Sequence, residues 1–208
     1  MPTWDDIYRK YNSTGEKWAS LEEGVHPLFI RFIEKTDFRI KKALDIGCGD
    51  GRYMQFLRDA GFDVFGIDSS PAAVELVTER LGSRTAEVAD MYSYEIPRNE
   101  YFLIISMNTM HHGTKEQVTS LVGRVRESLI QGGRFFFTLP DIGSARKWNT
   151  FKYEQGLGDG ILVPKTGPER GIKHSFFAGA EIENLMSGYR NVFLQMDDRG
   201  RWFVRGTK

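Results

Sequence analysis

A short apolar run that ends in alternating glycines is the feature of this sequence that most restricts its fold. The run Ala43-Leu44-Asp45-Ile46 is followed at once by Gly47-Cys48-Gly49-Asp50-Gly51, and helical apolar spacing begins at about Arg52. This order predicts a strand, a glycine loop and a helix. Such a loop lets the backbone approach a ligand closely and leaves unpaired amides of the next helix facing it, so it favours a nucleotide-like cofactor.

The rest of the chain repeats the alternation of strands and helices. Further strands are predicted at 62–67, 85–89, 101–107, 134–139, 191–196 and 202–205, and helices at 21–35, 71–81, 115–130 and 180–187. Alternating elements of this kind indicate parallel strands joined by right-handed crossovers. The turn at Asp197–Gly200 favours a hairpin, which makes the last strand antiparallel. The predicted fold class is α/β, with a Rossmann-like, doubly wound and mostly parallel sheet.

Length and composition narrow the class of protein. A chain of 208 residues predicts one domain spanning residues 1–208. Its 28 Lys and Arg balance its 28 Asp and Glu, so no global field draws it to nucleic acid or an anionic membrane. The single cysteine, Cys48, fits a reducing compartment. Because no apolar stretch approaches the roughly 18 residues of a membrane span, we expect a cytoplasmic protein.

Two segments fall outside the regular alternation. Residues 1–38 carry Trp4, Tyr8 and Tyr11 at helical spacing, with Trp18 further on. This segment is either a helical lid whose aromatic rings cover the cofactor or an amphipathic helix packed on the domain. Residues 140–178, rich in Gly, Pro, Lys and Asp at their start, predict an irregular insertion on the substrate side.

Acidic residues close the second and third predicted strands, where side chains face a ligand at the carboxyl edge of the sheet. Asp68 can accept both hydroxyls of a ribose, or it can cap the next helix, and Asp90 can meet an adenine edge. Arg52 stands where a dinucleotide fingerprint has its third glycine, which argues against a nicotinamide-dependent oxidoreductase. Arg52 either pairs with a cofactor carboxylate or is a solvated residue at the helix start.

The stretch Ala43-Leu44-Asp45-Ile46-Gly47-Cys48-Gly49-Asp50-Gly51-Arg52 resembles the class I S-adenosylmethionine-dependent methyltransferases, and the resemblance covers roughly residues 40–140. More loosely, the chain is similar to the tellurite-resistance-type and small-molecule branches of that superfamily. The resemblance implies a seven-stranded sheet with a reversed last strand. It also implies that the glycine turn lies against the methionine part of the cofactor, Asp68 at its ribose, and Asp90 with Met91 at its adenine.

The cofactor expected from these features is S-adenosyl-L-methionine. The predicted cofactor-binding residues are Asp45, Gly47, Cys48, Gly49, Gly51, Arg52, Asp68, Ser69, Asp90, Met91 and Asn108. Asp45 either orients the glycine loop or reaches the cofactor through water. For Cys48, packing is the favoured role, since the chain has no partner cysteine for redox chemistry.

Polar residues after the fourth predicted strand are the candidate catalytic groups. In the family, the segment matching Asn108–His111 borders the methyl group. His111 or His112 can remove a proton from the acceptor, and His174 is a third candidate, although each can instead be structural. The predicted catalytic residues are His111, His112, His174 and Asn108. No metal site is expected, because no Cys, Asp or Glu near these histidines has ligand spacing.

The predicted activity is in-line methyl transfer from S-adenosylmethionine to a small-molecule acceptor. Amino groups of nucleic acids are disfavoured as acceptors, because Asn108 does not begin an Asp/Asn-Pro-Pro-aromatic element. A tRNA or RNA acceptor stays an alternative, since tRNA-modifying relatives also place a histidine after the fourth strand. A metalloid oxyanion ranks lower. A non-catalytic cofactor-binding protein of the same fold is the other alternative, and the sequence gives no oligomeric state.

Overall fold

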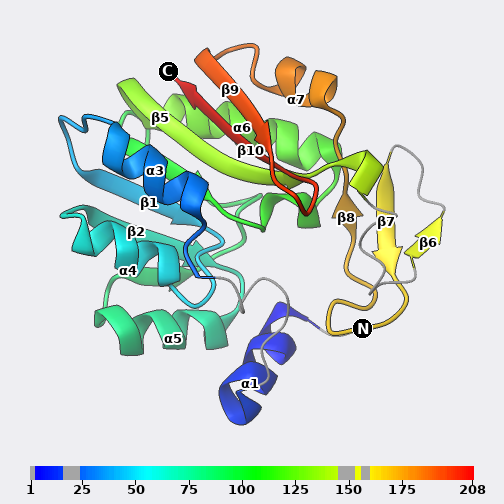
Figure 1. Ribbon diagram of the computed structural model, residues 1–208. Coiled ribbons are helices and arrows are strands. Elements are labelled where there is room, and N and C mark those ends of the chain that lie inside the picture. The colour runs from blue at the N-terminus through cyan, green and yellow to red at the C-terminus, as the bar shows by residue number, and fades with distance from the viewer. Residues whose placement is uncertain (1–2, 16–23, 145–152, 156–159) are drawn as a thin grey trace.

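A seven-stranded sheet forms the centre of the molecule. The computed structural model describes residues 3–15, 24–144, 153–155 and 160–208 (Figure 1). The sheet has the strand order β3-β2-β1-β4-β5-β10-β9. Its strands are β1 (Lys42–Ile46), β2 (Asp63–Asp68), β3 (Ala86–Val88), β4 (Tyr101–Ser106), β5 (Leu129–Pro140), β9 (Arg190–Met196) and β10 (Arg201–Thr207). Strand β10 is antiparallel to both neighbours, and the pairs from β3 to β5 are parallel. The α/β prediction is confirmed.

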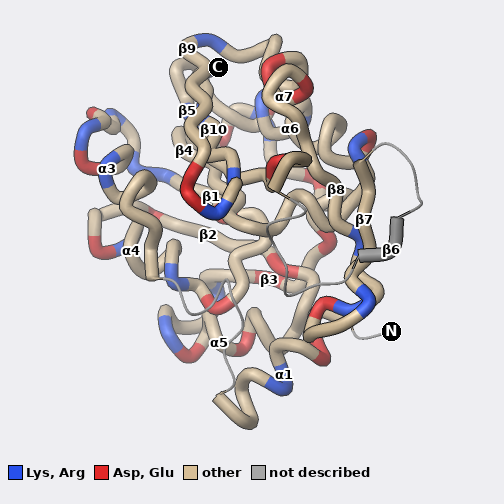
Figure 2. Tube along the Cα trace, turned by 45° about the vertical axis from the view of Figure 1, so that its right-hand side comes forward, with Lys and Arg blue, Asp and Glu red and all other residues tan. Residues whose placement is uncertain are grey.

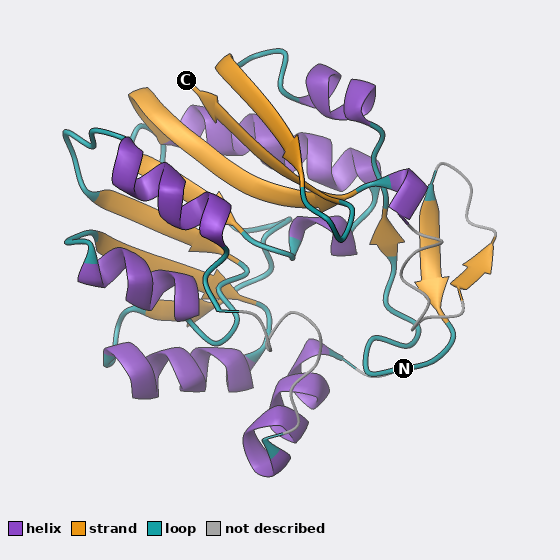
Figure 3. Ribbon diagram, viewed as in Figure 1, coloured by secondary structure: helices purple, strands orange, loops and turns teal. Residues whose placement is uncertain are grey.

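Helices cover both faces of this sheet (Figure 3). The helices are α1 (Trp4–Thr14), α3 (Pro27–Lys35), α4 (Arg52–Asp59), α5 (Pro71–Leu81), α6 (Lys115–Ser128) and α7 (Gly179–Leu185), with 3-10 turns η1 (Met110–His112) and η2 (Ile142–Ser144). Side chains of α3, α4 and α5 share one buried apolar cluster, and those of α6 and α7 share another. Among the described residues, no helix has the length and the apolar run needed to cross a bilayer.

The central strand β4 shows why the sheet needs covering on both sides. All six of its residues are buried. Leu103 and Ile105 point into the cluster with α3, α4 and α5, whereas Ile104 points into the cluster with α6. Because successive side chains of a strand face opposite ways, an unbroken apolar run fits only a strand that is covered on both faces.

Local signals set the ends of the helices beside the site. Helix α5 begins at Pro71. Ser70 caps it, because its hydroxyl accepts a hydrogen bond from the Ala73 amide. Helix α4 ends at Asp59, and Gly61 follows with a φ of 86°. These ends lie within one or two residues of the predictions. The helix expected at 21–35 begins only at Pro27, because His26 caps it by accepting the Leu28 amide at Nδ1. Residues 24–26 are not helical, and residues 21–23 lie outside the described part.

Part of the segment 140–178 forms a second, antiparallel sheet. Its strands are β6 (Tyr153–Gln155), β7 (Ile161–Pro164) and β8 (His174–Ser175). The expectation of irregular structure is wrong for these residues. The strands are only two to four residues long, so no alternating pattern long enough to predict a strand could be seen.

The cluster around Phe29 offers a test of the packing. Phe29 is fully buried and its ring lies against four other aromatic rings. We expect Phe29→Ala to lower the free energy of unfolding by about 3–5 kcal/mol, since it leaves a cavity in the core. Urea unfolding measures this value. Ile40→Ala, at a side chain that is 48% exposed, is the control and should change it by less than about 0.5 kcal/mol. Equal effects would contradict the packing.

Candidate cofactor and methyl-transfer site

The glycine loop after β1 lies against the loop after β4. The amides of Gly47 and Cys48 both donate to the Ile67 carbonyl, at 2.8 and 3.0 Å, which fixes the start of the turn. Gly47 has a φ of 72°, and a Cβ built there would lie 2.3 Å from Oγ1 of Thr109. No larger residue fits this position without a shift. The close approach brings the predicted cofactor loop beside the segment that carries the predicted catalytic residues.

Asp68 joins the glycine loop to the start of α5. Its Oδ2 accepts from the Gly49 amide and its Oδ1 from the Ser70 amide, each at 2.9 Å. Burial raises the pKa of this carboxyl, while the amides of Ser70 and Gly49 act in the opposite direction. The Ser69 amide also lowers the pKa of this carboxyl. Since a carboxylate has about four acceptor sites, three amide donors leave about one site for a further donor. Sequence reasoning offered Asp68 as a ribose ligand or as a cap, and the geometry is compatible with both.

Asp45, Arg52 and Cys48 have different surroundings. Asp45 is buried within β1, where desolvation and the charges of Asp68 and Asp50 hold its pKa well above the usual range. Arg52 pairs through Nε with Oδ1 of Asp50 at 2.9 Å, a partner that the sequence did not suggest. Its side chain is 15% exposed, which does not fit a solvated arginine. Cys48 is buried against Gly66, in agreement with a packing role.

The predicted adenine side is more open. Asp90 is exposed, and its Oδ1 accepts from the Tyr92 amide at 3.0 Å in the turn after β3. Met91 is half-buried and packs against the core, whereas Ser69 is exposed at the end of β2. These residues follow neighbouring strands at one edge of the sheet, as the sequence predicted. Their contact with a cofactor stays a prediction.

Helix α1 lies across the glycine loop and the start of α5. Oδ1 of Asp5 accepts from the Ser70 hydroxyl at 3.1 Å and from the Ala72 amide at 2.9 Å. The amide of Ala72 is the main reason why the pKa of Asp5 is lowered. Tyr8 is buried, and its hydroxyl oxygen would lie 2.4 Å from a Cβ on Gly49. The helix is therefore packed on the domain and also covers the loop, and Trp18 lies outside the described residues.

The three candidate histidines come together. His111 and His112 lie in η1, and His174 comes from β8. The ring centroids are 4.0 Å apart for His111 and His112, 5.3 Å for His111 and His174, and 4.9 Å for His112 and His174. The Trp4 ring lies 4.5 Å from that of His112. Burial is the main reason why the pKa values of His111 and His112 are well below the usual range, so both imidazoles are neutral at pH 7.

Two residues that sequence reasoning missed hold these candidates in place. Glu169 contacts Nε2 of His174 through Oε2 at 2.7 Å. Thr138 accepts from the Asn108 amide at 2.7 Å and donates to Oδ1 of Asn108 at 3.1 Å. Asn108 has a φ of 57°, and Thr138 stabilises this left-handed conformation. Thr138 lies within a predicted strand next to the fourth one, and could have been found from strand register. Glu169 lies in the insertion and gave no sequence signal.

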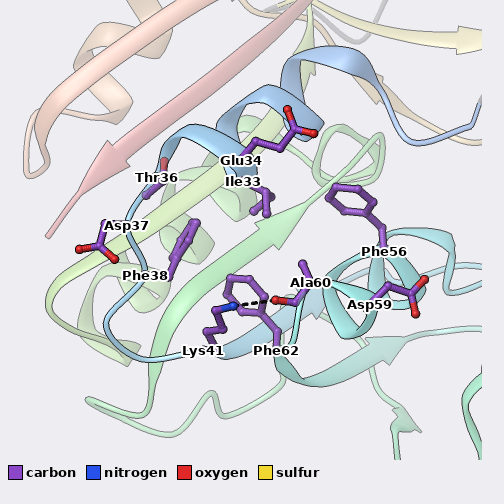
Figure 4. Close-up of a pocket in the computed structure, with 10 residues that line it drawn as sticks. All are labelled: Ile33, Glu34, Thr36, Asp37, Phe38, Lys41, Phe56, Asp59, Ala60 and Phe62. Atoms are coloured by element: carbon purple, nitrogen blue, oxygen red, sulfur yellow. Dashed lines mark hydrogen bonds between the residues drawn. The ribbon is translucent and has the colours of Figure 1, made fainter.

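A groove on the opposite edge of the molecule is not part of this site. It has a volume of about 530 Å³ and lies between the ends of α3 and α4 (Figure 4). Lys41 crosses it and donates to the Ala60 carbonyl at 2.8 Å. The groove lies where β1 and β2 begin, whereas ligands of open α/β sheets bind at the carboxyl ends of the strands.

Comparison with known proteins agrees with this architecture. Residues 43–133 match a family model described as a methyltransferase domain. An uncharacterized methyltransferase of Anoxybacillus flavithermus is 27% identical over 59% of this chain and 56% of its own. A Saccharomyces cerevisiae tRNA (carboxymethyluridine(34)-5-O)-methyltransferase is 24% identical over 78% and 57%. A ubiquinone biosynthesis O-methyltransferase of Acinetobacter baylyi is 27% identical over 55% and 50%. The chain thus spans about half the length of these relatives.

Solved structures show the same fold. A Pyrococcus horikoshii protein is 20% identical with a TM-score of 0.73, covering 100% of this chain and 95% of its own. A Methanosarcina mazei protein described as an S-adenosylmethionine-dependent methyltransferase is 16% identical with a TM-score of 0.69, covering 89% and 99%. Residues 43–133 thus match a methyltransferase-domain model, and the chain shares its fold with a solved protein that is described as an S-adenosylmethionine-dependent methyltransferase.

The contact between α1 and the glycine loop can be tested by a double-mutant cycle. We expect Gly49→Ala to destabilise the protein by about 1 kcal/mol or more, because Gly49 has a φ of 56° and its new Cβ meets the Tyr8 hydroxyl. Tyr8→Phe removes that hydroxyl. The two changes should therefore be non-additive by about 0.5–3 kcal/mol in urea unfolding. Strict additivity would show that Tyr8 does not lie on the loop.

Proposed function

We propose that this chain binds S-adenosylmethionine and transfers its methyl group to an acceptor. The observation that carries the proposal is the Asp68 carboxylate, which ties the Gly49 amide to the Ser70 amide at the carboxyl edge of the sheet. The glycine loop would hold the methionine part, Asp68 the ribose, and Asp90 with Met91 the adenine. Asp45, Arg52, Ser69 and Asn108 complete the proposed cofactor site.

The proposed acceptor is a small molecule that binds between the cofactor and the histidines. A sulfonium methyl group is already electrophilic, so the protein must mainly align the acceptor with the S–CH₃ bond and exclude water. Trp4 and the short strand β8 lie beside the histidines. Burial keeps His111 and His112 neutral, so each has a lone pair for a proton, although their lowered pKa makes them weak bases. The left-handed Asn108 would position the methyl group.

A tRNA acceptor is the second candidate. It is favoured by the yeast tRNA methyltransferase, which matches 78% of this chain, a larger share than the ubiquinone relative matches. Against it, Lys and Arg alternate with Asp and Glu along the trace (Figure 2), whereas nucleic-acid sites gather basic residues. The similarity to the tellurite-resistance branch and the cytoplasmic location stay predictions.

Asp68→Ala tests the cofactor site. We expect it to weaken binding of S-adenosylmethionine by about 1–3 kcal/mol, a loss of roughly 5- to 150-fold, because hydrogen bonds to a charged acceptor disappear. Isothermal titration calorimetry measures the affinity, and circular dichroism checks the fold. Asp63→Ala is the matched control, since Asp63 is exposed at the opposite end of the same strand. Unchanged affinity in a folded Asp68 variant would remove the ribose assignment.

The acceptor class can be decided with radiolabelled cofactor. The protein is incubated with methyl-labelled S-adenosylmethionine and either a low-molecular-mass metabolite extract or total tRNA. We expect label to be transferred to the metabolite fraction. At limiting cofactor, the Asp68→Ala variant should transfer less label, by at least the factor by which its affinity for S-adenosylmethionine falls. Transfer to tRNA alone would replace the small-molecule proposal by the second candidate.

A further inference from the structure

The histidine cluster, defined as His111, His112 and His174, has the arrangement of a metal-binding site. Each residue can offer one ring nitrogen such that the three nitrogens all lie within 4.8 Å of one another. In a tetrahedral zinc site with Zn–N bonds of about 2.0–2.1 Å, ligand nitrogens lie about 3.3 Å apart. The rings therefore need to approach by at most about 1.5 Å. The sequence predicted no metal site, because no Cys, Asp or Glu near the three histidines has ligand spacing. The fold brings His174 beside the other two from 62 residues further along the chain.

Two of the three imidazoles have a buried nitrogen that makes no hydrogen bond within the described residues. Within the described residues, neither Nδ1 of His111 nor Nε2 of His112 has a hydrogen-bond partner, although both atoms are buried. Buried polar atoms are normally paired, and an exception calls for an explanation such as a bound ion. The backbone of Thr109 partly offsets the lowering of the His112 pKa, so a backbone group faces this imidazole as well. A histidine ligand is commonly oriented by such a backbone group at its second nitrogen.

His174 is held by both of its nitrogens. Nδ1 lies 3.1 Å from the Ile172 carbonyl oxygen, and Nε2 lies 2.7 Å from Oε2 of Glu169. Binding of a metal through one nitrogen replaces one of these contacts and retains the other. The retained contact, to a carbonyl or to a carboxylate, is the kind of partner that orients metal-bound histidines.

Hydrogen bonds outside the rings fix the two elements that carry the cluster. The Ser175 hydroxyl donates to the Gly113 carbonyl at 2.6 Å, which joins the residue after His174 to the residue after His112. The Tyr92 hydroxyl donates to the Met110 carbonyl at 2.7 Å and anchors the start of η1. The cluster is thus built on a braced backbone, as a specific site requires.

Arg201 is the basic residue that acts electrostatically on His111. Its Nε pairs with Oδ2 of Asp197 at 2.8 Å, and both side chains are largely buried. The positive charge that faces the cluster is therefore balanced by an adjacent carboxylate. Arg201 lowers the pKa of His111 and so disfavours positive charge at the cluster, and the adjacent Asp197 carboxylate weakens this effect.

We propose that the histidine cluster binds one divalent transition-metal ion, Zn²⁺ above all, through three imidazole nitrogens. Imidazole suits zinc, copper, iron and nickel, whereas calcium and magnesium require oxygen ligands. Three histidines leave a fourth position open, as in zinc sites that bind water or substrate. The proposal concerns metal binding by the chain itself and does not require the proposed methyl transfer. If both hold, the metal-bound imidazoles no longer serve as bases, and an acceptor oxygen is the natural occupant of the open position.

Titration of the cofactor-free protein with Co²⁺ tests the proposal. The protein is prepared without a histidine tag and stripped with chelator, and visible absorption of bound Co²⁺ is followed, with Zn²⁺ as competitor. We expect one ion per chain with micromolar or tighter affinity, displacement by Zn²⁺, and no effect of excess Mg²⁺. His112→Ala and His174→Ala should each lower the affinity for Co²⁺ at least tenfold. His26→Asn, which replaces the fourth histidine of the chain, is the matched control and should leave it unchanged.

A measurement on the unaltered protein guards against variants that fail to fold. In ¹⁵N spectra of the histidine side chains, Zn²⁺ should shift the ring nitrogens of three histidines and spare those of His26, which stacks on Phe203. Absence of stoichiometric Co²⁺ binding would overturn the proposal. Equal binding by folded His112 and His174 variants, or Zn²⁺ shifts at His26 alone, would overturn it as well.

Discussion

The carboxylate of Asp68 is the contact on which the geometry of the proposed site depends. It lies at the end of a buried strand and accepts one amide from the glycine loop and one from the start of α5. Without it, two buried backbone donors lose their acceptor. The same carboxyl has a raised pKa, because burial disfavours its charged form. A structural bridge that keeps an acceptor site is well placed to bind a ligand hydroxyl.

A second loop shares this edge of the sheet, and its shape follows from the close contact with Gly47. Thr109 occupies the space that a side chain at Gly47 would need. Thr138 then holds Asn108 in its left-handed conformation, and η1 turns His111 and His112 inward. These contacts form a continuous chain that links the glycine loop to the histidines. The proposed cofactor site and the histidine cluster are therefore parts of one packed unit.

Sequence reasoning predicted the sheet and much of the site because the relevant signals are local. The run 101–106 has no polar residue until Ser106, the glycines follow β1 directly, and Ser70-Pro71 marks a helix start. What it missed depends on distant contacts. Glu169 meets His174 inside a segment of short strands, and Asp5 meets the Ala72 amide across 67 residues. Neither contact produces a periodic pattern in the sequence. Only the folded chain shows that His174 lies beside His111 and His112.

The position of α1 bears on the affinity that the glycine loop can have for a ligand. Tyr8 lies on Gly49, and Asp5 accepts a hydrogen bond from the start of α5, so a ligand at the outer face of the loop would have to fit beside the helix or displace it. A protein whose receptive form is a minor population shows an affinity reduced by that fraction. If binding displaces the helix, the strength of the two hydrogen bonds that Asp5 accepts sets a threshold concentration for occupancy. Changes at this helix would then tune the protein to scarce or abundant cofactor without altering a single ligand contact.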